Sequence, residues 1–331
     1  MMRVTAVAAV VMLGAGFQQE VQVRGRLVAT AGGDVDWYFW GADTRIVTYG
    51  GRWGGTGHIV SVEAASGKAT ELYTGATWTS GALSRDGKRL VVLGRLWNGD
   101  DVVADTDVGK PEFDEGYHSE TLQSPVIFSP DGKKMAYPGQ DPHKSWICVE
   151  DVATGEVKRI AENRGRISSL SWSPDGKWFT YGFTIEEQRE VWMAAADGSS
   201  FRNLTVHQAQ DFSPTWAPDS KRVAFISDRD KGYDVYVIAV ENRVVRRVTA
   251  DGARKADVAW SPKDGVIVAR TFRDMKWTFI FTTPGGDKVR IARMESRPHG
   301  PPVWSPKGDS ILYLSVQDTG ANVLMACQPP N

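Results

Sequence analysis

The stretch Trp172-Ser173-Pro174-Asp175-Gly176-Lys177 decides the fold, because variants of it recur along the chain at an almost constant interval. Each copy opens with an aromatic or large apolar residue, and these residues are Trp40, Leu83, Phe128, Trp172, Trp216, Trp260 and Trp304. Successive copies are 43, 45, 44, 44, 44 and 44 residues apart. A fixed period in the low forties, with one turn signal per repeat, is typical of a propeller whose blades are four-stranded sheets.

The chemistry of each copy favours a tight chain reversal. Pro174 fixes φ, Asp175 can accept a hydrogen bond from the backbone of its own turn, and Gly176 tolerates a positive φ. The segments that follow a copy have the β-branched and aromatic content of strands. In the fifth repeat we expect strands over 222–227, 234–238 and 244–249. The sequence therefore predicts an all-β fold in which each turn joins an inner strand to its neighbour.

The number of copies predicts a seven-bladed propeller, with six blades as the alternative if the first copy, which lacks proline, is not a blade. After Trp304 only two strands are expected, over 311–315 and 322–326. The last blade then lacks its outer strand, and we expect residues Val21 to Val28 to supply it. Pairing of the two chain ends in one blade would close the ring and remove a free sheet edge. The acidic stretch from Asp100 to Gly116 predicts irregular outer strands, or an acidic loop, in blade two.

The first residues predict export. One positive charge at Arg3 is followed by the apolar run from Val4 to Leu13 and by the small residues Gly14-Ala15-Gly16. We interpret residues 1–16 as a signal peptide cleaved before Phe17, with a disordered cytosolic start as the alternative. Residues 17–331 then form one propeller domain without a transmembrane segment, and the location is periplasmic or secreted. The net charge of -1 gives no reason to expect a nucleic-acid partner.

The chain has two cysteines, Cys148 and Cys327, and both fall in expected third strands, of blades three and seven. Their separation around the ring argues against a disulfide, because the two Cα atoms of a bridge must lie within about 7 Å. We expect two buried free thiols.

A full repeat resembles the propeller repeat of TolB-like proteins. The similarity runs from Asp197-Gly198-Ser199 through Leu204-Thr205 to Pro214-Thr215-Trp216-Ala217-Pro218-Asp219, and on to Asp234-Val235-Tyr236. It implies the propeller fold over the chain from about Val21 onward and leaves the function open. Propellers of this kind occur in the Tol-Pal envelope system, beside serine peptidase domains, and as lyases that use histidine-bound metal on acidic polysaccharide.

One face of the predicted ring gathers the candidate binding residues. The loops between second and third strands, and those between blades, emerge opposite the Pro-Asp-Gly turns, and aromatic and imidazole side chains there can stack on a sugar or anchor a peptide. The candidates are Trp53, His58, Trp97, His118, His143, His207, Trp277 and His299. Histidine is also common in loops for no functional reason, so a shared metal or catalytic site is the less favoured interpretation. The same face carries an excess of basic residues, which suits an anionic ligand or is an ordinary solvated rim.

Alternating aspartates at Asp228, Asp230 and Asp234 resemble the start of a calcium loop. The distal bidentate glutamate of such a loop is missing, so turn capping is the favoured role. We therefore predict no cofactor, with calcium or another divalent metal as the open alternative.

Function is predicted by elimination. The chain contains no Gly-x-Ser-x-Gly elbow, no His-Glu-x-x-His pair, no phosphate-binding loop and no paired-cysteine metal site. The prediction is an exported, non-catalytic module that binds a protein or peptide. The alternatives are a carbohydrate-binding or metal-dependent polysaccharide lyase propeller, and a scaffold subunit of an envelope complex.

Overall fold

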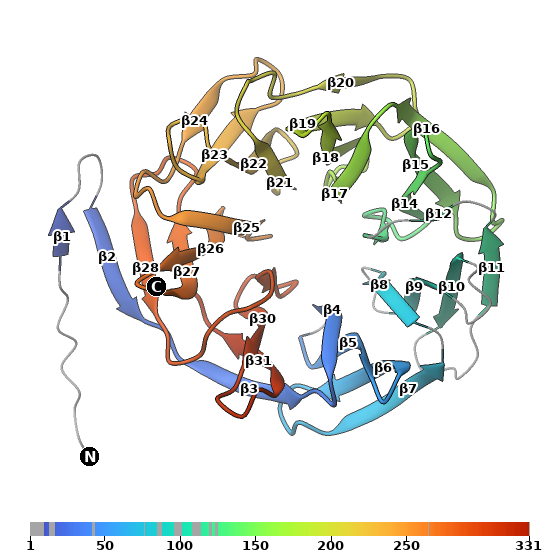
Figure 1. Ribbon diagram of the computed structural model, residues 1–331, viewed down its shortest axis with the longest axis horizontal. Helices are drawn as coiled ribbons and strands as arrows, with labels where there is room; N and C mark the ends of the chain where they lie inside the picture. The colour runs from blue at the N-terminus through green and yellow to red at the C-terminus, as the bar shows by residue number, and fades with distance from the viewer. Residues whose placement is uncertain are drawn as a thin grey trace.

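The computed structural model describes residues 10–12, 17–41, 44–75, 77–84, 88–95, 101–107, 114–118, 121–122, 125–263 and 265–330. For 10–12, 17–18, 77–79, 101–107, 114–118 and 121–122 it describes the backbone alone. The described residues are strands, turns and loops without a helix, and so they include no helix that could cross a membrane. The all-β prediction is confirmed, and Figure 1 shows the sheets arranged around a common centre as a propeller.

The described strands hydrogen-bond into seven sheets that succeed one another along the chain. The first contains β4 (Asp34–Trp40), β5 (Ile46–Trp53), β6 (Thr56–Glu63) and β7 (Ala69–Gly75). The second contains β8 (Thr77–Leu83), β9 (Arg89–Arg95), β10 (Asp101–Asp107) and β11 (Asp114–His118). The third contains β12 (Thr121–Leu122), β13 (Ile127–Phe128), β14 (Lys134–Gln140), β15 (Ser145–Asp151) and β16 (Val157–Asn163). The fourth contains β17 (Arg166–Trp172), β18 (Trp178–Ile185), β19 (Gln188–Ala195) and β20 (Phe201–Asn203).

The remaining sheets follow the same order. The fifth contains β21 (Asp211–Trp216), β22 (Arg222–Ser227), β23 (Asp234–Ala239) and β24 (Val245–Arg247). The sixth contains β25 (Arg254–Trp260), β26 (Ile267–Arg273), β27 (Lys276–Thr282) and β28 (Val289–Arg293), with β2 (Phe17–Gln22) and β1 (Val10–Met12) added beyond β28. The seventh contains β29 (Val303–Trp304), β30 (Ile311–Val316), β31 (Asn322–Cys327) and β3 (Gly25–Thr30).

Two faces of the ring follow from the antiparallel order of the strands. The repeated turns join the first strand of a sheet to the second, so they share one face with the turns between third and fourth strands. We call this the lower face. The opposite, upper face carries the loops between second and third strands and the connections between sheets. The first strands, such as β17, β21 and β25, lie nearest the centre (Figure 1).

The chain ends meet in the last sheet, as the sequence predicts. Strand β3 pairs antiparallel with β31 and supplies the missing outer strand. The predicted segment Val21 to Val28 is nevertheless divided, because β2 ends at Gln22 and pairs in parallel with β28 of the preceding sheet. The backbone N–H of Val23 continues that pairing by donating to the carbonyl of Arg293 (3.0 Å). The N-terminal strands therefore join two neighbouring sheets.

The repeated turn has the predicted geometry. Gly176 has a φ of 74°, and Asp175 Oδ1 accepts hydrogen bonds from the Ser173 hydroxyl (2.6 Å) and the Lys177 N–H (3.1 Å). The turn is thus held by hydrogen bonds that the Asp175 side chain accepts from a side chain and from the backbone of the same turn.

Blade two corrects one prediction. The acidic stretch contributes to two regular strands: Asp101 to Asp107 pair with β9, and Asp101 to Asp105 also pair with β11. Residues 108–113 lie outside the described residues. Acidic side chains are compatible with strands near the outer edge of a sheet, where charge also discourages pairing with other chains.

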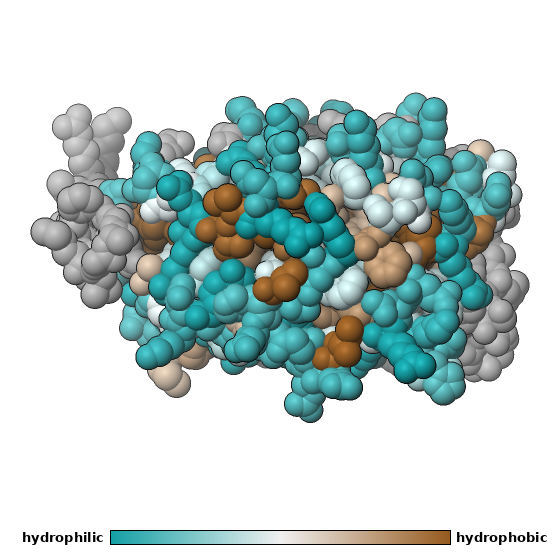
Figure 2. Space-filling view, turned by 90° about the horizontal axis from the view of Figure 1, so that it is seen from above, coloured by the Kyte–Doolittle hydropathy of each residue, from teal (hydrophilic) through white to brown (hydrophobic). Residues whose placement is uncertain are grey.

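The core lies between neighbouring sheets. One cluster joins Val191 and Met193 of β19 to Trp216, Phe225 and Tyr236 of the next sheet. Each blade therefore buries one face against the following blade, which is how a propeller distributes its core. Figure 2 shows the ring edge-on, and the side of the outer wall that faces the viewer is mostly hydrophilic, with separate hydrophobic patches.

Candidate binding site

The inner ends of three first strands surround an open cavity of about 900 Å³ on the upper face. Its wall comes from the start of β17, the start of β21 and the start of β25, with loop residues of the fourth and fifth sheets closing the outer side. The wall includes Arg166, Ser169, Glu187, Arg189, Gln210, Phe212, Ser213, Tyr233, Arg254 and Lys255. We call this space the upper cavity. A second cavity, of about 750 Å³, lies among the repeated turns of the third and fourth sheets on the lower face.

Three exposed arginines give the upper cavity its charge. Arg166 and Arg254 are the first residues of β17 and β25, and Arg189 is the second residue of β19. Among the described residues, the guanidinium groups of Arg166 and Arg254 have no hydrogen bond or ion pair. Glu187 is the one acidic residue among the described lining residues. The wall therefore presents free hydrogen-bond donors with a positive charge, which suits a planar anion such as a carboxylate.

Aromatic rings form the middle of the wall. Phe212 and Tyr233 meet edge to face with their centroids 5.8 Å apart, and the guanidinium carbon of Arg189 lies 5.6 Å from the centre of the Phe212 ring. Both rings are half-buried. The two rings add apolar surface beside the positively charged arginines. A ligand with both apolar and negatively charged groups can contact the rings and the arginines at the same time.

The inner strands are bulged where they line the cavity. The register shifts between Ser168 and Ser171 in β17, between Phe212 and Thr215 in β21, and between Lys255 and Asp257 in β25. Ser169 and Ser213 have φ values of 50° and 52°, which non-glycine residues adopt rarely. Bulges of this kind re-aim side chains and are common beside functional sites.

A buried ion network supports the cavity from below. Lys255 Nζ donates to Asp234 Oδ1 (2.9 Å), to the carbonyl of Ala253 (2.9 Å) and to the carboxylate of Asp251. The Lys255, Asp234 and Asp251 side chains are fully buried. Burial lowers the pKa of Lys255 to about 8, while the Asp234 carboxylate acts in the opposite direction.

Two arginines complete the network. Arg247 Nη2 donates to Asp234 (2.5 Å), and Arg273 Nη1 donates to Asp251 (2.8 Å). Asp234 and Arg247 belong to the fifth sheet, whereas Lys255 and Arg273 belong to the sixth. The network fixes the connection between two blades and with it the start of β25, where Arg254 lies.

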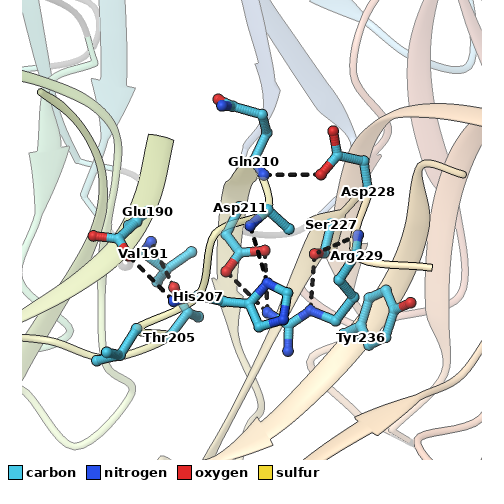
Figure 3. A network of polar contacts seen from close by, with 12 residues as sticks. Glu190, Val191, Thr205, His207, Gln210, Asp211, Ser227, Asp228, Arg229 and Tyr236 are labelled. Carbon is cyan, nitrogen blue, oxygen red and sulfur yellow. Dashed lines mark hydrogen bonds and ion pairs between the residues drawn. The ribbon is translucent and has the colours of Figure 1, made fainter. Parts of the chain in front are cut away.

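A second network positions the β21 side of the wall (Figure 3). Arg229 Nη2 donates to both carboxylate oxygens of the fully buried Asp211 (3.1 and 2.9 Å). Its guanidinium also lies over the ring of Tyr236, 4.9 Å from the centroid. The backbone N–H of Gln210 donates to Asp228 Oδ1 (2.8 Å). Gln210 and Phe212 are the chain neighbours of Asp211, so the buried ion pair between Asp211 and Arg229 fixes the position of both residues.

The predicted aspartates do not converge on one point. Asp228 accepts from the Gln210 backbone, and Asp230 accepts from the Tyr236 hydroxyl (2.6 Å). Asp234 belongs to the buried network, whose Arg247 also lies 3.7 Å from the Asp230 carboxylate. Among the residues that the structure describes, no group of three or more His, Cys, Asp or Glu could hold a metal ion.

Trp53 and His58 meet on the upper side of the first sheet, away from the upper cavity. The rings stack with centroids 3.9 Å apart, and His58 Nδ1 pairs with Glu71 Oε1 at 2.5 Å. This hydrogen bond lowers the pKa of Glu71. His58 lies within β6 instead of in the preceding loop, because the turn between β5 and β6 is only two residues long.

The other predicted histidines are spread over the upper side of separate blades. His207 lies between β20 and β21. Its backbone N–H donates to Glu190 Oε1 (3.2 Å), and its ring Nδ1 accepts from the backbone N–H of Ala209 (3.0 Å). His143 lies in the loop before β15, and its N–H donates to Asp141. The carbonyl of His299 accepts from Arg270. None of these three lines the upper cavity.

Two of the remaining predicted residues cannot be placed by their side chains. His118 ends β11, where only the backbone is described, and Trp97 lies outside the described residues. Trp277, in β27, packs against Phe272 and lies under the guanidinium of Arg270, 4.4 Å from the ring centre. It does not line the upper cavity either.

The cysteines confirm the prediction made for them. Cys148 in β15 and Cys327 in β31 are free and buried. Burial raises the pKa of each thiol to about 12.

Comparison with known proteins decides the family. The family model described as the TolB beta propeller domain matches residues 102–329, which is more than half of the chain. The chain belongs to the TolB beta propeller domain family. This confirms the resemblance seen in the repeats of this TolB-family propeller.

Solved structures share the fold of this TolB-family propeller at low identity. Oligogalacturonate lyase from Vibrio parahaemolyticus has a TM-score of 0.74 and 12% identity, covering 94% of this chain and 98% of the lyase. An oligogalacturonate lyase in complex with manganese has a TM-score of 0.74 and 15% identity, covering 96% and 99%. A putative TolB from Agrobacterium tumefaciens has a TM-score of 0.54 and 19% identity, covering 80% and 95%. None of the curated proteins matches this chain in sequence.

Sequence reasoning missed the centre of the site in this TolB-family propeller. The sequence predicted only a general excess of basic residues on this face and favoured histidine and tryptophan, whereas Arg166, Arg189 and Arg254 line the upper cavity. Aromatic residues that line the upper cavity, Phe212 and Tyr233, were not singled out. The signal that could have found Arg166 and Arg254 is positional, because each stands six residues before the tryptophan of its repeat.

Proposed function

We propose that this propeller is a non-catalytic module that binds a protein or peptide partner through its upper face. The observation that carries the proposal is the upper cavity, an open space of about 900 Å³ at the inner ends of three blades, lined by unpaired arginines and an aromatic pair. Recognition sites of this kind combine a few well-placed polar groups with apolar surface. The seven sheets support counting seven blades in the ring that presents this face.

Crosslinking from both faces tests the proposal. A photoreactive amino acid replaces Ser168 in the wall of the upper cavity, and in a second variant it replaces Lys177 in the lower cavity. The full-length gene is expressed in the native cell for both variants. We expect a protein crosslinked from position 168 and absent from position 177. A partner captured only from position 177 would place recognition on the wrong face for this proposal, and peptide or glycan turnover by purified protein would contradict the non-catalytic part.

We also propose that residues 1–16 are a signal peptide and that the mature protein is periplasmic or secreted. The support is the short apolar run from Val4 to Leu13, followed by small residues. N-terminal sequencing of the protein from fractionated cells and medium tests this, with Phe17 as the expected first residue. A cytosolic protein that retains Met1 or Met2 would contradict export, and stable isolation with membrane proteins would favour a role as a scaffold subunit.

A carbohydrate-binding or lyase function is the second candidate, because the arginines of the upper cavity would also suit an acidic sugar. The metal that a lyase of this fold implies does not fit the described residues. His207 and His299 do not line the cavity, and no described cluster could hold the ion. Incubation with oligogalacturonate and manganese tests this candidate. Unsaturated products that disappear when His207 and His299 are replaced together would establish it over partner binding.

A further inference from the structure

We propose that the upper cavity recognises an acidic peptide segment, with Arg166 and Arg254 as the residues that bind its carboxylates. This inference rests on the proposed function and adds the chemistry of the partner. A carboxylate offers two coplanar acceptor oxygens, and a guanidinium offers a matching planar pair of donors. Specificity for acidic side chains would then come from the inner rim of the ring.

These two arginines are free to bind a ligand. Two other positive groups nearby are already matched within the fold, Lys255 with Asp234 and Asp251 and Arg229 with Asp211. The guanidinium of Arg189 lies over the Phe212 ring. Arg166 and Arg254 are exposed and have no partner among the described residues. An incoming carboxylate would therefore gain their donors without breaking an internal ion pair.

Their placement suits an extended ligand. Arg166 and Arg254 begin the inner strands of the fourth and sixth sheets, on either side of β21. The equivalent residue of the fifth sheet is Gln210, an uncharged side chain in the same wall. The two positive groups thus flank a neutral position, which suits an extended segment that carries acidic residues at intervals.

The rest of the wall favours a peptide over an acidic sugar. The Phe212 ring already has the Arg189 guanidinium near its face and Tyr233 against it, so part of its stacking surface is in use. The bulged strands bring Ser168, Ser169 and Ser213 to the wall. These serines offer backbone groups and hydroxyls, the partners that an extended peptide main chain uses.

Fluorescence anisotropy with defined probes tests the inference. The first probe is a labelled twelve-residue peptide of alternating Glu and Gly, and the second is the same peptide with Gln in place of Glu. Unlabelled tetragalacturonate serves as a competitor. The protein is the full chain as isolated from the cell, with variants R166Q and R254Q. R164Q is the matched control, because Arg164 is also exposed and stands two residues before Arg166 but does not line the cavity.

We expect the acidic peptide to bind at least about tenfold more tightly than the Gln peptide, because hydrogen bonds between charged groups are stronger than those to a neutral amide. R166Q and R254Q should each weaken acidic-peptide binding about tenfold, and R164Q by less than about twofold. Raising salt from about 50 to about 200 mM should weaken binding of the acidic peptide more than that of the Gln peptide.

The outcomes separate this inference from the proposed function. Equal binding of both peptides, lost in F212A but kept in R166Q, would overturn acidic recognition and leave peptide binding in place. Binding of tetragalacturonate with no binding of either peptide would overturn both in favour of carbohydrate. If R164Q weakened binding as much as R166Q, the peptide would be bound by general surface charge and the inference of a specific site would be overturned. No binding of the acidic peptide at about 1 mM would also overturn it.

Discussion

Replacement of Lys255 by methionine is expected to destabilise the fold strongly while keeping the volume of the side chain. Lys255 is fully buried and gives its ammonium group to Asp234, Asp251 and the Ala253 carbonyl. Methionine cannot donate, so both carboxylates lose their central partner. Each keeps one arginine, Arg247 for Asp234 and Arg273 for Asp251. The variant therefore leaves two buried negative charges that are only partly compensated.

The magnitude follows from the burial of the network. Breaking a buried ion pair by removing one partner costs about 3–5 kcal/mol, because the remaining charge stays desolvated. Unfolding entropy is about 2.1 cal/mol/K per residue, which for a chain of 331 residues gives about 0.7 kcal/mol/K. If the ring unfolds as one unit, the melting temperature should fall by about 4–7 °C. The arginines hold the loss toward the lower end of this range.

Scanning calorimetry and urea titration of the full chain measure the effect, with K276M as the control. Lys276 is exposed, lies in the sixth sheet as Lys255 does, and has no ion pair among the described residues. K276M should change the free energy of unfolding by less than about 0.5 kcal/mol. Adding D251N to K255M should recover part of the loss, because it removes one of the stranded charges. A decrease in the free energy of unfolding of less than about 1 kcal/mol in K255M would refute this account of the network. So would additivity, in which D251N destabilises K255M by as much as it destabilises the wild-type protein.

Three further predictions concern the thiols, the turns and the ring closure. Burial raises the pKa of Cys148 and Cys327 to about 12, so their contribution to the free energy of unfolding is fully present below about pH 9 and is lost as the pH rises toward 12. In native protein at pH 8 neither thiol should react with a disulfide reagent. Rapid labelling would contradict their burial. G176A should cost about 1 kcal/mol in urea titration, because Gly176 has a φ of 74° while the space around it is open; an unchanged midpoint would show that the turn relaxes. A29P should remove a ladder bond between β3 and β31 and raise amide hydrogen exchange in β31 first, whereas protection lost equally in all blades would place the weak point elsewhere.

The fold could be predicted from the sequence because each repeat carries its own turn chemistry. Arg222–Ser227 was expected as a strand and is β22, and the turn at Gly176 has the predicted φ. The prediction was less accurate where local chemistry is weak. The outer strands of blade two were missed because their acidic residues resemble a loop. The N-terminal segment was expected as one strand, but its pairing partners in two neighbouring sheets are tertiary contacts that composition does not reveal.

The candidate site was harder to predict, because residue type was a poor guide to convergence. Histidine and tryptophan were chosen for their chemistry, yet the His58 ring contacts Trp53 and Glu71, and His207 organises its own loop. Of the aspartates in the supposed calcium loop, Asp228 accepts from the Gln210 backbone, whereas Asp230 and Asp234 both pair with Arg247. Local sequence shows that such groups are present, but the strand ends decide which of them face the same space.

The repeat itself contains the missing information. In a propeller, residues one period apart occupy the same position in successive blades, so they lie at the same height and the same distance from the centre. Arg166, Gln210 and Arg254 are separated by 44 residues each, and all three line the upper cavity. A residue six positions before the repeat tryptophan therefore faces the inner rim in these three blades. The sequence signal for a candidate ligand is therefore the charge at equivalent positions of successive repeats. The total charge of the face does not contain this information.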